Sequence, residues 1–254
     1  MARTHEGGQN EVAIEPEGSI QQRVLRELAA LGDLRGKSVL DVGAGGGWLS
    51  AQLAAAGAKV TVLDLEARPA DPRIRAVVHN LDDPVLPFAD KEFDAVVSTE
   101  VLEHLRAPFL VLRELVRVLK KGGRLVLTIP NYWNIKYRLR YLLTGNFQRL
   151  KIDSREDRAF YLRGYAPHIN AIPYPILKTV LSWEGCEHFT LGHKRLLGWP
   201  QRLFFAPWLA AIRLFTWCGG ARRRARQLLD ETNSDSALLG ARQVLIACTK
   251  TGRG

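Results

Sequence analysis

The sequence predicts an α/β protein built on a doubly wound, parallel sheet. Short apolar runs of strand type alternate with helical periodicity along the first half of the chain. A glycine-rich turn follows the first strand, and an acidic residue follows the second. In such a sheet both features meet at the carboxyl edge of neighbouring strands, where ligands bind. The 254 residues suffice for one domain of this class with an appendage.

Periodicity and capping residues predict the elements in chain order. A polar tail over 1–18, expected to be disordered, precedes one domain over 19–254. Ser19 is the expected N-cap of the first helix. Further helices are expected over 48–56, 108–120, 133–143 and 173–183. Strands are expected over 39–42, 59–63, 75–79, 124–129, 187–191 and 241–249. Another strand, the fourth in chain order, is expected to end at residue 98.

The glycine turn predicts a binding site for a nucleoside derivative. Gly43, Gly45 and Gly47 let the backbone approach a ligand, because no Cβ is in the way. The free N–H groups of the next helix face the same place. Asp41 precedes the turn, and its carboxylate repels phosphate but suits an ammonium or sulfonium ion. Trp48 stands where the dinucleotide pattern has its third glycine, so a nucleotide-binding or purely structural turn is the alternative.

An acidic residue after the second strand supports the same interpretation. Asp64 follows that strand, with Leu65 beside it. A carboxylate at this place can accept two parallel hydrogen bonds from the ribose hydroxyls of an adenosine. A helix N-cap or a loop carboxylate is the alternative.

A stretch over 86–97 resembles a known family. It reads Leu-Pro-Phe-Ala-Asp-Lys-Glu-Phe-Asp-Ala-Val-Val, and the type-11 methyltransferases carry Leu-Pro-Phe-x-Asp-x-x-Phe-Asp-x-Val here. The glycine turn resembles motif I of the class I methyltransferases that depend on S-adenosylmethionine (SAM). The resemblance covers roughly residues 36–190. It implies a Rossmann-like sheet of seven strands with helices on both faces, a helical insertion before the last strand, and an antiparallel last strand.

The resemblance also implies SAM as the methyl donor and assigns residues to it. The family places an Asp or Asn before the Leu-Pro-Phe motif to meet the adenine amino group, and Asn80 with Leu81 matches best. Asp82 is the alternative to Asn80, because the alignment of this stretch with the family motif is ambiguous by two residues. Ser98 ends the strand beneath the donor. The expected donor-binding residues are Asp41, Gly43, Gly45, Gly47, Asp64, Leu65, Asn80, Leu81, Asp82 and Ser98.

Three interpretations compete for Glu100, Glu103 and His104, which are expected on one face of a helix that opens at Glu100. The trio resembles the Glu-x-x-Glu-His that some quinone and RNA-end methyltransferases use as a divalent-metal site. It also matches Val-Leu-Glu-His-Leu of metal-free relatives, where the histidine is a general base or a packing residue. A carboxylate favoured by the helix macrodipole is the structural alternative. We take His104 as a catalytic candidate and assign no metal ligand.

His168 is the second catalytic candidate. A His-Ile-Asn before a helix, here His168-Ile169-Asn170, recurs in relatives thought to methylate bacterial cell-surface glycans and lipids. A buried, hydrogen-bonded histidine is the alternative. The segment over 131–170 is expected to form an acceptor loop or lid, with an irregular excursion as the alternative.

Charge is unevenly distributed along the chain. Residues 1–130 carry 16 basic and 18 acidic side chains, whereas residues 131–254 carry 20 and 8. An anionic partner is one explanation, and a solvated basic face is the other. A helical basic insertion is expected over 193–238. Within it, aromatic residues beside arginines over 203–226 suit a helix lying on an anionic membrane. A cap over the acceptor pocket or a dimer face is the alternative.

The remaining features concern location and reaction. Three cysteines without metal-type spacing, and the lack of an apolar segment at the beginning of the sequence, indicate a cytoplasmic protein, with a peripheral place at the inner membrane face as an extension.

The predicted reaction is SAM-dependent O-methylation of a small molecule, lipid or cell-surface glycan. An RNA methyltransferase and a non-catalytic, membrane-associated SAM-binding protein are the alternatives. The sequence identifies neither the acceptor atom nor the oligomeric state.

Overall fold

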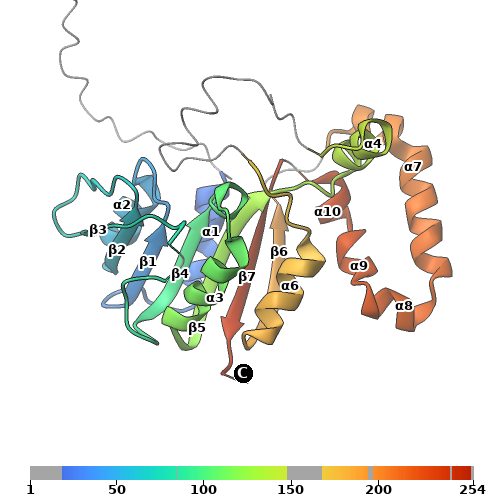
Figure 1. The fold of residues 1–254 in the computed structure, drawn as a ribbon. Coiled ribbons are helices and arrows are strands. Elements are labelled where there is room, and N and C mark those ends of the chain that lie inside the picture. The colour runs from blue at the N-terminus through green and yellow to red at the C-terminus, as the bar shows by residue number, and fades with distance from the viewer. Residues whose placement is uncertain (1–18, 84, 148–167, 194–196, 241, 253–254) are drawn as a thin grey trace, which may run out of the picture.

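A seven-stranded sheet in the order β3-β2-β1-β4-β5-β7-β6 forms the centre of the computed structural model (Figure 1). The structure describes residues 19–83, 85–147, 168–193, 197–240 and 242–252. The strands are parallel from β3 to β5, and β7 runs antiparallel to both β5 and β6. The predicted sheet is therefore confirmed. Its strands are β1 Ser38–Val42, β2 Lys59–Asp64, β3 Arg75–Val78, β4 Phe93–Thr99, β5 Leu119–Pro130, β6 Cys186–His193 and β7 Gln243–Lys250.

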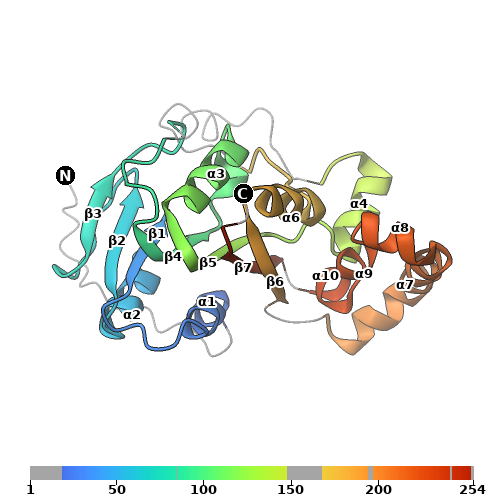
Figure 2. The same ribbon diagram turned by 90° about the horizontal axis from the view of Figure 1, so that it is seen from below.

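Helices cover both faces of the sheet (Figure 2). One face packs against α1 (Ile20–Ala29) and α2 (Trp48–Ala55), and the other against α3 (Pro108–Val118) and α6 (Tyr174–Trp183). Alternate residues of a strand pack against the two helix layers, α1 with α2 and α3 with α6, because successive side chains of a strand point to opposite faces. In β1, Val39 belongs to the α1–α2 layer, whereas Leu40 belongs to the α3–α6 layer.

Local signals explain where these helices begin. The Ser19 side chain accepts a hydrogen bond from the Gln22 amide at 3.2 Å, which is the predicted N-cap of α1. Pro108 occupies the first turn of α3, where its missing N–H costs nothing. Burial then stabilises each helix, since a fully buried Leu such as Leu112 or Leu115 contributes about 1.5–3 kcal/mol.

Strand β5 begins five residues earlier than predicted. The Lys-Lys-Gly-Gly run over 120–123 belongs to this strand and does not close the preceding helix. The register of β4 on β5 shifts between Phe93 and Ala95, so an irregularity accommodates the extra residues. Lys120 pairs there with Asp94 at 2.9 Å. A Cβ on Gly123 would lie 2.9 Å from the Asp94 carbonyl oxygen, which explains the glycine at this place.

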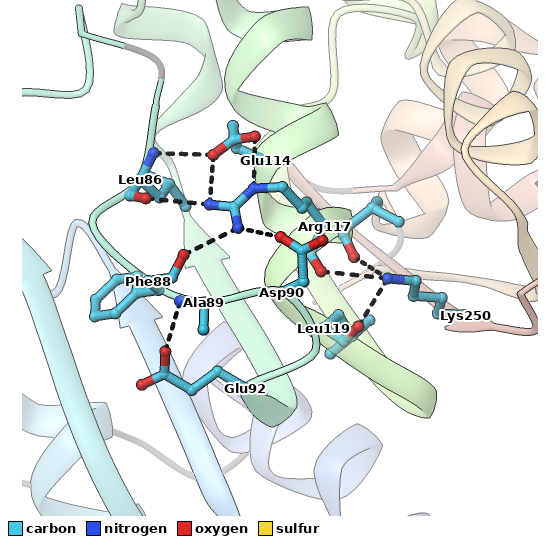
Figure 3. A network of polar contacts seen from close by, with 10 residues as sticks. Leu86, Phe88, Ala89, Asp90, Glu92, Glu114, Arg117, Leu119 and Lys250 are labelled. Atoms are coloured by element: carbon cyan, nitrogen blue, oxygen red, sulfur yellow. Dashed lines mark hydrogen bonds and ion pairs between the residues drawn. The ribbon is translucent and has the colours of Figure 1, made fainter.

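The Leu-Pro-Phe motif has a structural role that its family resemblance does not reveal (Figure 3). The Arg117 guanidinium donates to the carbonyl oxygens of Leu86 and Phe88 at 3.1 and 2.9 Å and to the Asp90 carboxylate at 2.7 Å. It also forms a two-bonded ion pair with Glu114 at 2.7 and 2.8 Å, which lowers the pKa of Glu114. Arginine donors suit such a fork-like arrangement. The motif is thereby fixed at the amino end of β4, away from the ligand edge.

A helical insertion lies between β6 and β7, as predicted. It comprises α7 (Trp199–Cys218), α8 (Gly220–Arg226), α9 (Leu229–Thr232) and α10 (Asp235–Leu239), beside α4 (Ile135–Thr144) at the β6 end of the sheet (Figures 1 and 2). A small core joins α4, α7 and α10 through Ile135, Phe205, Leu209, Leu238 and Leu239. No single described helix is long and apolar enough to cross a bilayer. The pair α7–α8 passes that test by length and composition, but it bends by 109°.

Candidate active site

The glycine turn after β1 has the backbone conformation that only glycine adopts easily. Gly43, Gly45 and Gly47 have φ values of 71°, 51° and 71°, in the region where an ordinary side chain is strained. The Gly43 amide donates to the Leu63 carbonyl oxygen at 2.8 Å. A Cβ on Gly43 would lie only 2.3 Å from Cγ2 of Val101. The turn therefore packs directly against the segment that follows β4.

Asp64 connects the end of β2 to this turn. Its Oδ2 accepts a hydrogen bond from the Gly45 amide at 3.1 Å, and its Oδ1 accepts one from the Glu66 amide at 3.3 Å. The structure thus brings the predicted acid and the predicted turn together. Leu65 follows directly and is half-buried.

Asp41 lies inside the protein and does not expose its charge beside the turn. The residue is 1% exposed, and its Oδ2 accepts a hydrogen bond from the Ser50 hydroxyl at 2.5 Å. Burial raises the pKa of Asp41 to about 6, against the lowering effect of Ser50, and nearby Asp64 raises it further. Its Oδ1 has no hydrogen-bond partner among the described residues. One buried oxygen of Asp41 is therefore available to a ligand group that reaches it.

The predicted adenine-binding residues lie in a tight turn after β3. Asn80 accepts a hydrogen bond from the Asp82 amide at 2.9 Å, and its side chain is exposed. Both oxygens of Asp82 contact Arg106 at 3.3 Å, once through its amide and once through its guanidinium. Leu81 is buried. The carboxylate of Asp82 is thus engaged, whereas the Asn80 amide group faces solvent.

Ser98 lies at the carboxyl end of β4, beside Val42 of β1 and Leu127 of β5 in the sheet. It is buried, and its hydroxyl has no hydrogen-bond partner within the described part of the chain. This position is the central part of the carboxyl edge, as expected for a residue beneath a ligand.

The predicted helix opening at Glu100 is wrong. Glu100 has a φ of 56°, and only Leu102–His104 form a helical turn, of the 3-10 type. The Glu100 amide donates to the Thr128 carbonyl oxygen at 3.0 Å, and the Thr128 hydroxyl donates to the Glu100 carboxylate at 3.2 Å. These bonds hold Glu100 against the end of β5, so it cannot share a helix face with Glu103 and His104.

Glu103, His104 and His168 come together instead. Each offers one ligand atom, and these atoms all lie within 4.8 Å of one another. The two imidazole rings pack edge to face with centroids 4.6 Å apart. His168 Nδ1 is also hydrogen-bonded to the Tyr132 hydroxyl at 3.0 Å. The structure therefore unites both catalytic candidates with a glutamate.

Backbone contacts anchor the segment that carries His168. The amides of Ile169 and Asn170 donate to the Glu103 carbonyl oxygen at 2.9 and 3.0 Å. The Asn170 side chain donates to the Leu105 carbonyl oxygen. These bonds explain the His-Ile-Asn run in physical terms, because the two residues after the histidine attach it to the helical turn of His104.

The electrostatics of the cluster favour cation binding or proton transfer. Glu103 is buried, and neither of its carboxylate oxygens has a hydrogen-bond partner in the described ranges. Burial raises the pKa of Glu103 to about 8, and Glu100 raises it further. Burial and the neighbouring His104 lower the pKa of His168. A neutral imidazole is a metal ligand or a base, and a buried carboxylate requires a cation or a proton.

An apolar pocket of about 520 Å³ lies beside the cluster. Tyr132 belongs to both, since it lines the pocket and bonds to His168. The sequence placed 131–134 at this edge but gave no signal for the Tyr132–His168 bond. The other lining residues are Trp133, Arg138, Phe147, Ala171, Pro173, Ala211, Ile212, Phe215, Leu229, Thr232 and Asn233. Residues 148–167 of the predicted acceptor segment lie outside the described residues.

The strand order, the glycine turn after β1 and the acid after β2 together define a class I methyltransferase fold. Solved structures share this fold. A SAM-dependent methyltransferase from Archaeoglobus fulgidus superposes with a TM-score of 0.58 at 14% identity, over 91% of this chain and 93% of that one. A SAM-dependent methyltransferase from Mesorhizobium loti gives 0.53 at 19% identity, over 91% and 98%.

The family model of the methyltransferase domain, type 11, matches residues 40–127. This segment, about a third of the chain, is similar to the family that the sequence predicted. A ubiquinone biosynthesis O-methyltransferase of Xanthomonas oryzae pv. oryzae is 40% identical over 113 residues, covering 39% of this chain and 45% of that protein. One of the same name from Vibrio vulnificus is 29% identical over 171 residues, covering 63% and 68%. The chain thus spans about half the length of the first of these curated relatives.

Proposed function

We propose that this chain transfers a methyl group from SAM to an oxygen atom of a small-molecule acceptor. A bond forms between the acceptor oxygen and the methyl carbon as the bond from that carbon to sulfur breaks. The acceptor proton passes to a basic group, and the products are the methylated acceptor and S-adenosylhomocysteine. SAM is intrinsically reactive, so the residues of the chain align the acceptor, exclude water and accept the proton.

The donor is assigned to the glycine turn and its two acids. The exposed face of the turn allows close approach of an adenosine derivative, and Asp64 can exchange its bonds to the turn for bonds to the ribose hydroxyls. The unpartnered oxygen of buried Asp41 suits the cationic part of the donor. Asn80 is the adenine-binding candidate with an exposed amide group.

The observation that carries the proposal is the cluster of Glu103, His104 and His168 at the same edge of the sheet. Val101 packs against the glycine turn, and the cluster begins two residues later. An acceptor oxygen near these side chains therefore lies close to the donor. His104 and His168 are the groups that can accept its proton, because an imidazole of near-neutral pKa is an efficient base.

In an alternative arrangement, the same three residues would hold a divalent cation, and the histidines would then be ligands and not bases. A carboxylate oxygen without a hydrogen-bond partner and two imidazole nitrogens are a ligand set that suits divalent transition-metal ions. The ion would supply positive charge that lowers the pKa of a bound acceptor hydroxyl. Glu103 would then be ionised, and the histidines would hold the ion from the other side.

The acceptor class follows from the pocket. Its lining is predominantly apolar, and Tyr132 joins it to His168. We infer an acceptor with a hydroxyl at the cluster and an apolar portion in the pocket. The relatives named as ubiquinone biosynthesis O-methyltransferases agree with an oxygen acceptor of small size.

Calorimetry with SAM and S-adenosylhomocysteine tests whether the chain binds the proposed donor. Detection of a labelled product tests whether it transfers the methyl group. The purified chain is incubated with a cell extract and SAM that carries a deuterated methyl group, and mass spectrometry identifies what becomes labelled. We expect the labelled O-methyl derivative of an apolar hydroxyl compound and release of S-adenosylhomocysteine. The variant His188→Ala, which changes an exposed histidine on β6, serves as the matched control and keeps activity.

Two outcomes contradict the proposal in different ways. If neither nucleoside produces heat, the donor site is wrongly assigned. If both bind but no compound becomes labelled, the chain is a SAM-binding protein without transfer activity.

A further inference from the structure

The outward face of α7 is apolar along its whole length. Trp199 and Trp217 are 76% and 73% exposed, and Leu203 and Leu214 lie between them with more than half of their surface exposed. Their spacing places them on one side of the helix, opposite Phe205 and Leu209 of the small core. Phe204, Trp208 and Phe215 are exposed on one flank. A soluble helix normally has the reverse pattern, with its apolar side inward.

The polar side chains of α7 with described contacts interact with other parts of the insertion. Arg213 pairs with Asp235 of α10 at 2.7 Å. The Thr216 hydroxyl accepts a hydrogen bond from the Asn233 side chain at 2.8 Å. These contacts hold α7 in its orientation, so the apolar side remains outward. The exposed aromatic and aliphatic surface is therefore a fixed feature of the fold.

Arginines follow this face at once. After a bend of 109°, α8 carries Arg222, Arg223, Arg224 and Arg226. Arg223 stacks on the Phe215 ring at 4.6 Å, and Arg224 lies 3.5 Å from Asp230. Arg222 and Arg226 are exposed and have no ion-pair partner among the described residues. The stretch over 199–226 contains six arginines and no acidic residue.

We propose that α7 and α8 dock on an anionic lipid bilayer. The outward side of α7 would lie among the headgroups and upper acyl chains, with Trp199 and Trp217 at its two ends. Indole rings favour this interfacial region. The α8 arginines would contact the anionic headgroups. The bend between the helices excludes a straight crossing and suits a pair that lies on one leaflet.

The positive charge of this surface favours an anionic bilayer over a second copy of this chain as its partner. A symmetric dimer through this face would bring two sets of arginines together without an acidic residue from either stretch. Like charges in contact are unfavourable, whereas anionic lipids supply opposite charge and an apolar layer at once.

The flank of α7 that carries Phe215 borders the apolar pocket, so docking would place the pocket beside the membrane surface. Ala211, Ile212 and Phe215 of α7 line the pocket, and Tyr132 lies at its other side beside His168. A membrane-borne acceptor could then enter the pocket from the lipid. This consequence rests on the proposed function, whereas docking itself is measured without SAM or acceptor.

Vesicle flotation tests the docking surface. The full chain is mixed with vesicles of phosphatidylcholine and phosphatidylglycerol, or of phosphatidylcholine alone. We expect it to float with the anionic vesicles, to float less at high salt, and to stay mainly at the bottom with the neutral ones. Replacing Arg222 and Arg226 by Glu should lower the partition coefficient at least about 25-fold, since each lost arginine contributes about fivefold and the new carboxylates are repelled by the headgroups. The Leu203→Glu and Leu214→Glu pair should lower it at least about 100-fold, because each leucine leaves the apolar layer.

Matched variants separate docking from general effects. Val78→Glu with Val85→Glu places two charges on equally exposed aliphatic residues far from α7, and Arg68→Glu with Lys121→Glu repeats the charge reversal elsewhere. Both pairs should float like the wild type. Thermal melting of all variants confirms that they are folded.

Cys218 provides a direct readout. It is exposed at the end of α7, whereas Cys186 and Cys248 are buried, so an environment-sensitive dye can be attached at this one place. Its fluorescence should rise and shift to the blue with anionic vesicles. A wild-type chain that stays at the bottom of the gradient overturns the proposal. So does unchanged flotation of both α7–α8 variants, or a stable dimer in light scattering that these substitutions dissociate.

Discussion

The donor half and the acceptor half of the carboxyl edge are built differently. The donor half, above β1 and β2, consists of the glycine turn and the acids Asp41 and Asp64, which lie within 24 residues of sequence. The acceptor half joins Glu103 and His104 to His168, and the bond from Asn170 to Leu105 that supports it spans 65 residues. The donor half is therefore visible as a local motif, whereas the acceptor half exists only after folding.

The two halves also differ in how their carboxylates are satisfied. Asp64 accepts two backbone hydrogen bonds, and Asp41 accepts one from Ser50. Glu103 accepts none from the described residues through its side chain, although it is as deeply buried as Asp41. The donor half leaves one oxygen of Asp41 without a partner, whereas the acceptor half leaves both oxygens of Glu103 without one among the described residues and therefore gains more when a cation or a proton arrives. The predictions below test this contrast.

Removing the acceptor-side base gives the largest expected effect. His168→Ala should reduce turnover about 10²–10⁴-fold, the usual contribution of a general base, and it should leave the dissociation constant of SAM unchanged. Steady-state kinetics and calorimetry measure the two quantities. A variant that loses SAM binding in proportion to turnover would show that the halves are not separate. His188→Ala is the control.

The substitution of a glycine by alanine in the donor turn, which adds one methyl group, gives the next largest expected effect. Gly43→Ala should lower the free energy of unfolding by about 3 kcal/mol, because left-handed strain adds to the contact with Val101. Gly45→Ala has the strain but open space around its Cβ, so about 1–2 kcal/mol is expected. Denaturant unfolding measures both. Equal losses would mean that Val101 moves away, and Val101→Ala should then give no rescue of Gly43→Ala.

Loss of the Asp64 carboxylate should weaken SAM binding by about 1–3 kcal/mol, as for other charge-assisted hydrogen bonds. Calorimetry of Asp64→Ala measures this, and Asp64→Asn tests how much depends on charge. Unchanged affinity would remove Asp64 from the donor site. Turnover at saturating SAM should change little, since the acceptor half is intact.

The smallest effect per step is the pH dependence of cation binding, about tenfold for each pH unit. Glu103 has a pKa of about 8 and must lose its proton before it binds a divalent ion. The affinity for Mn²⁺ should therefore rise about tenfold per pH unit from pH 6 to 8 and then level off. His168 adds little competition there, because its pKa is lowered. Calorimetry in buffers of different ionisation enthalpy detects the released proton.

The variant Glu103→Gln provides the control for that experiment. It should lose most of the affinity and the pH dependence together. The sign for stability is the opposite of that for binding. A raised pKa means that the folded protein holds the proton more tightly, so this contribution is complete below the ordinary value of 4.5 and is lost as the pH rises through about 8. An affinity that is flat with pH would exclude Glu103 as a ligand.

Local patterns were sufficient for most of the fold. Ser19 at the start of α1, the glycines after β1 and the alternation of strands and helices depend on residues within a few positions of one another, and each is as predicted. The Lys-Lys-Gly-Gly run was misinterpreted because its strand conformation depends on pairing with β4. The roles of the donor-binding residues and the cytoplasmic location stay predictions.

The sequence by itself determined the succession of strands and helices and the donor turn, because backbone conformation and apolar periodicity are properties of neighbouring residues. Only the tertiary structure decided that Glu100 turns back to Thr128, that Glu103 joins His104 and His168, and that Asp41 is buried. It also decided which side of α7 faces outward. Burial and long-range contact depend on how distant segments pack, and no local pattern encodes that packing.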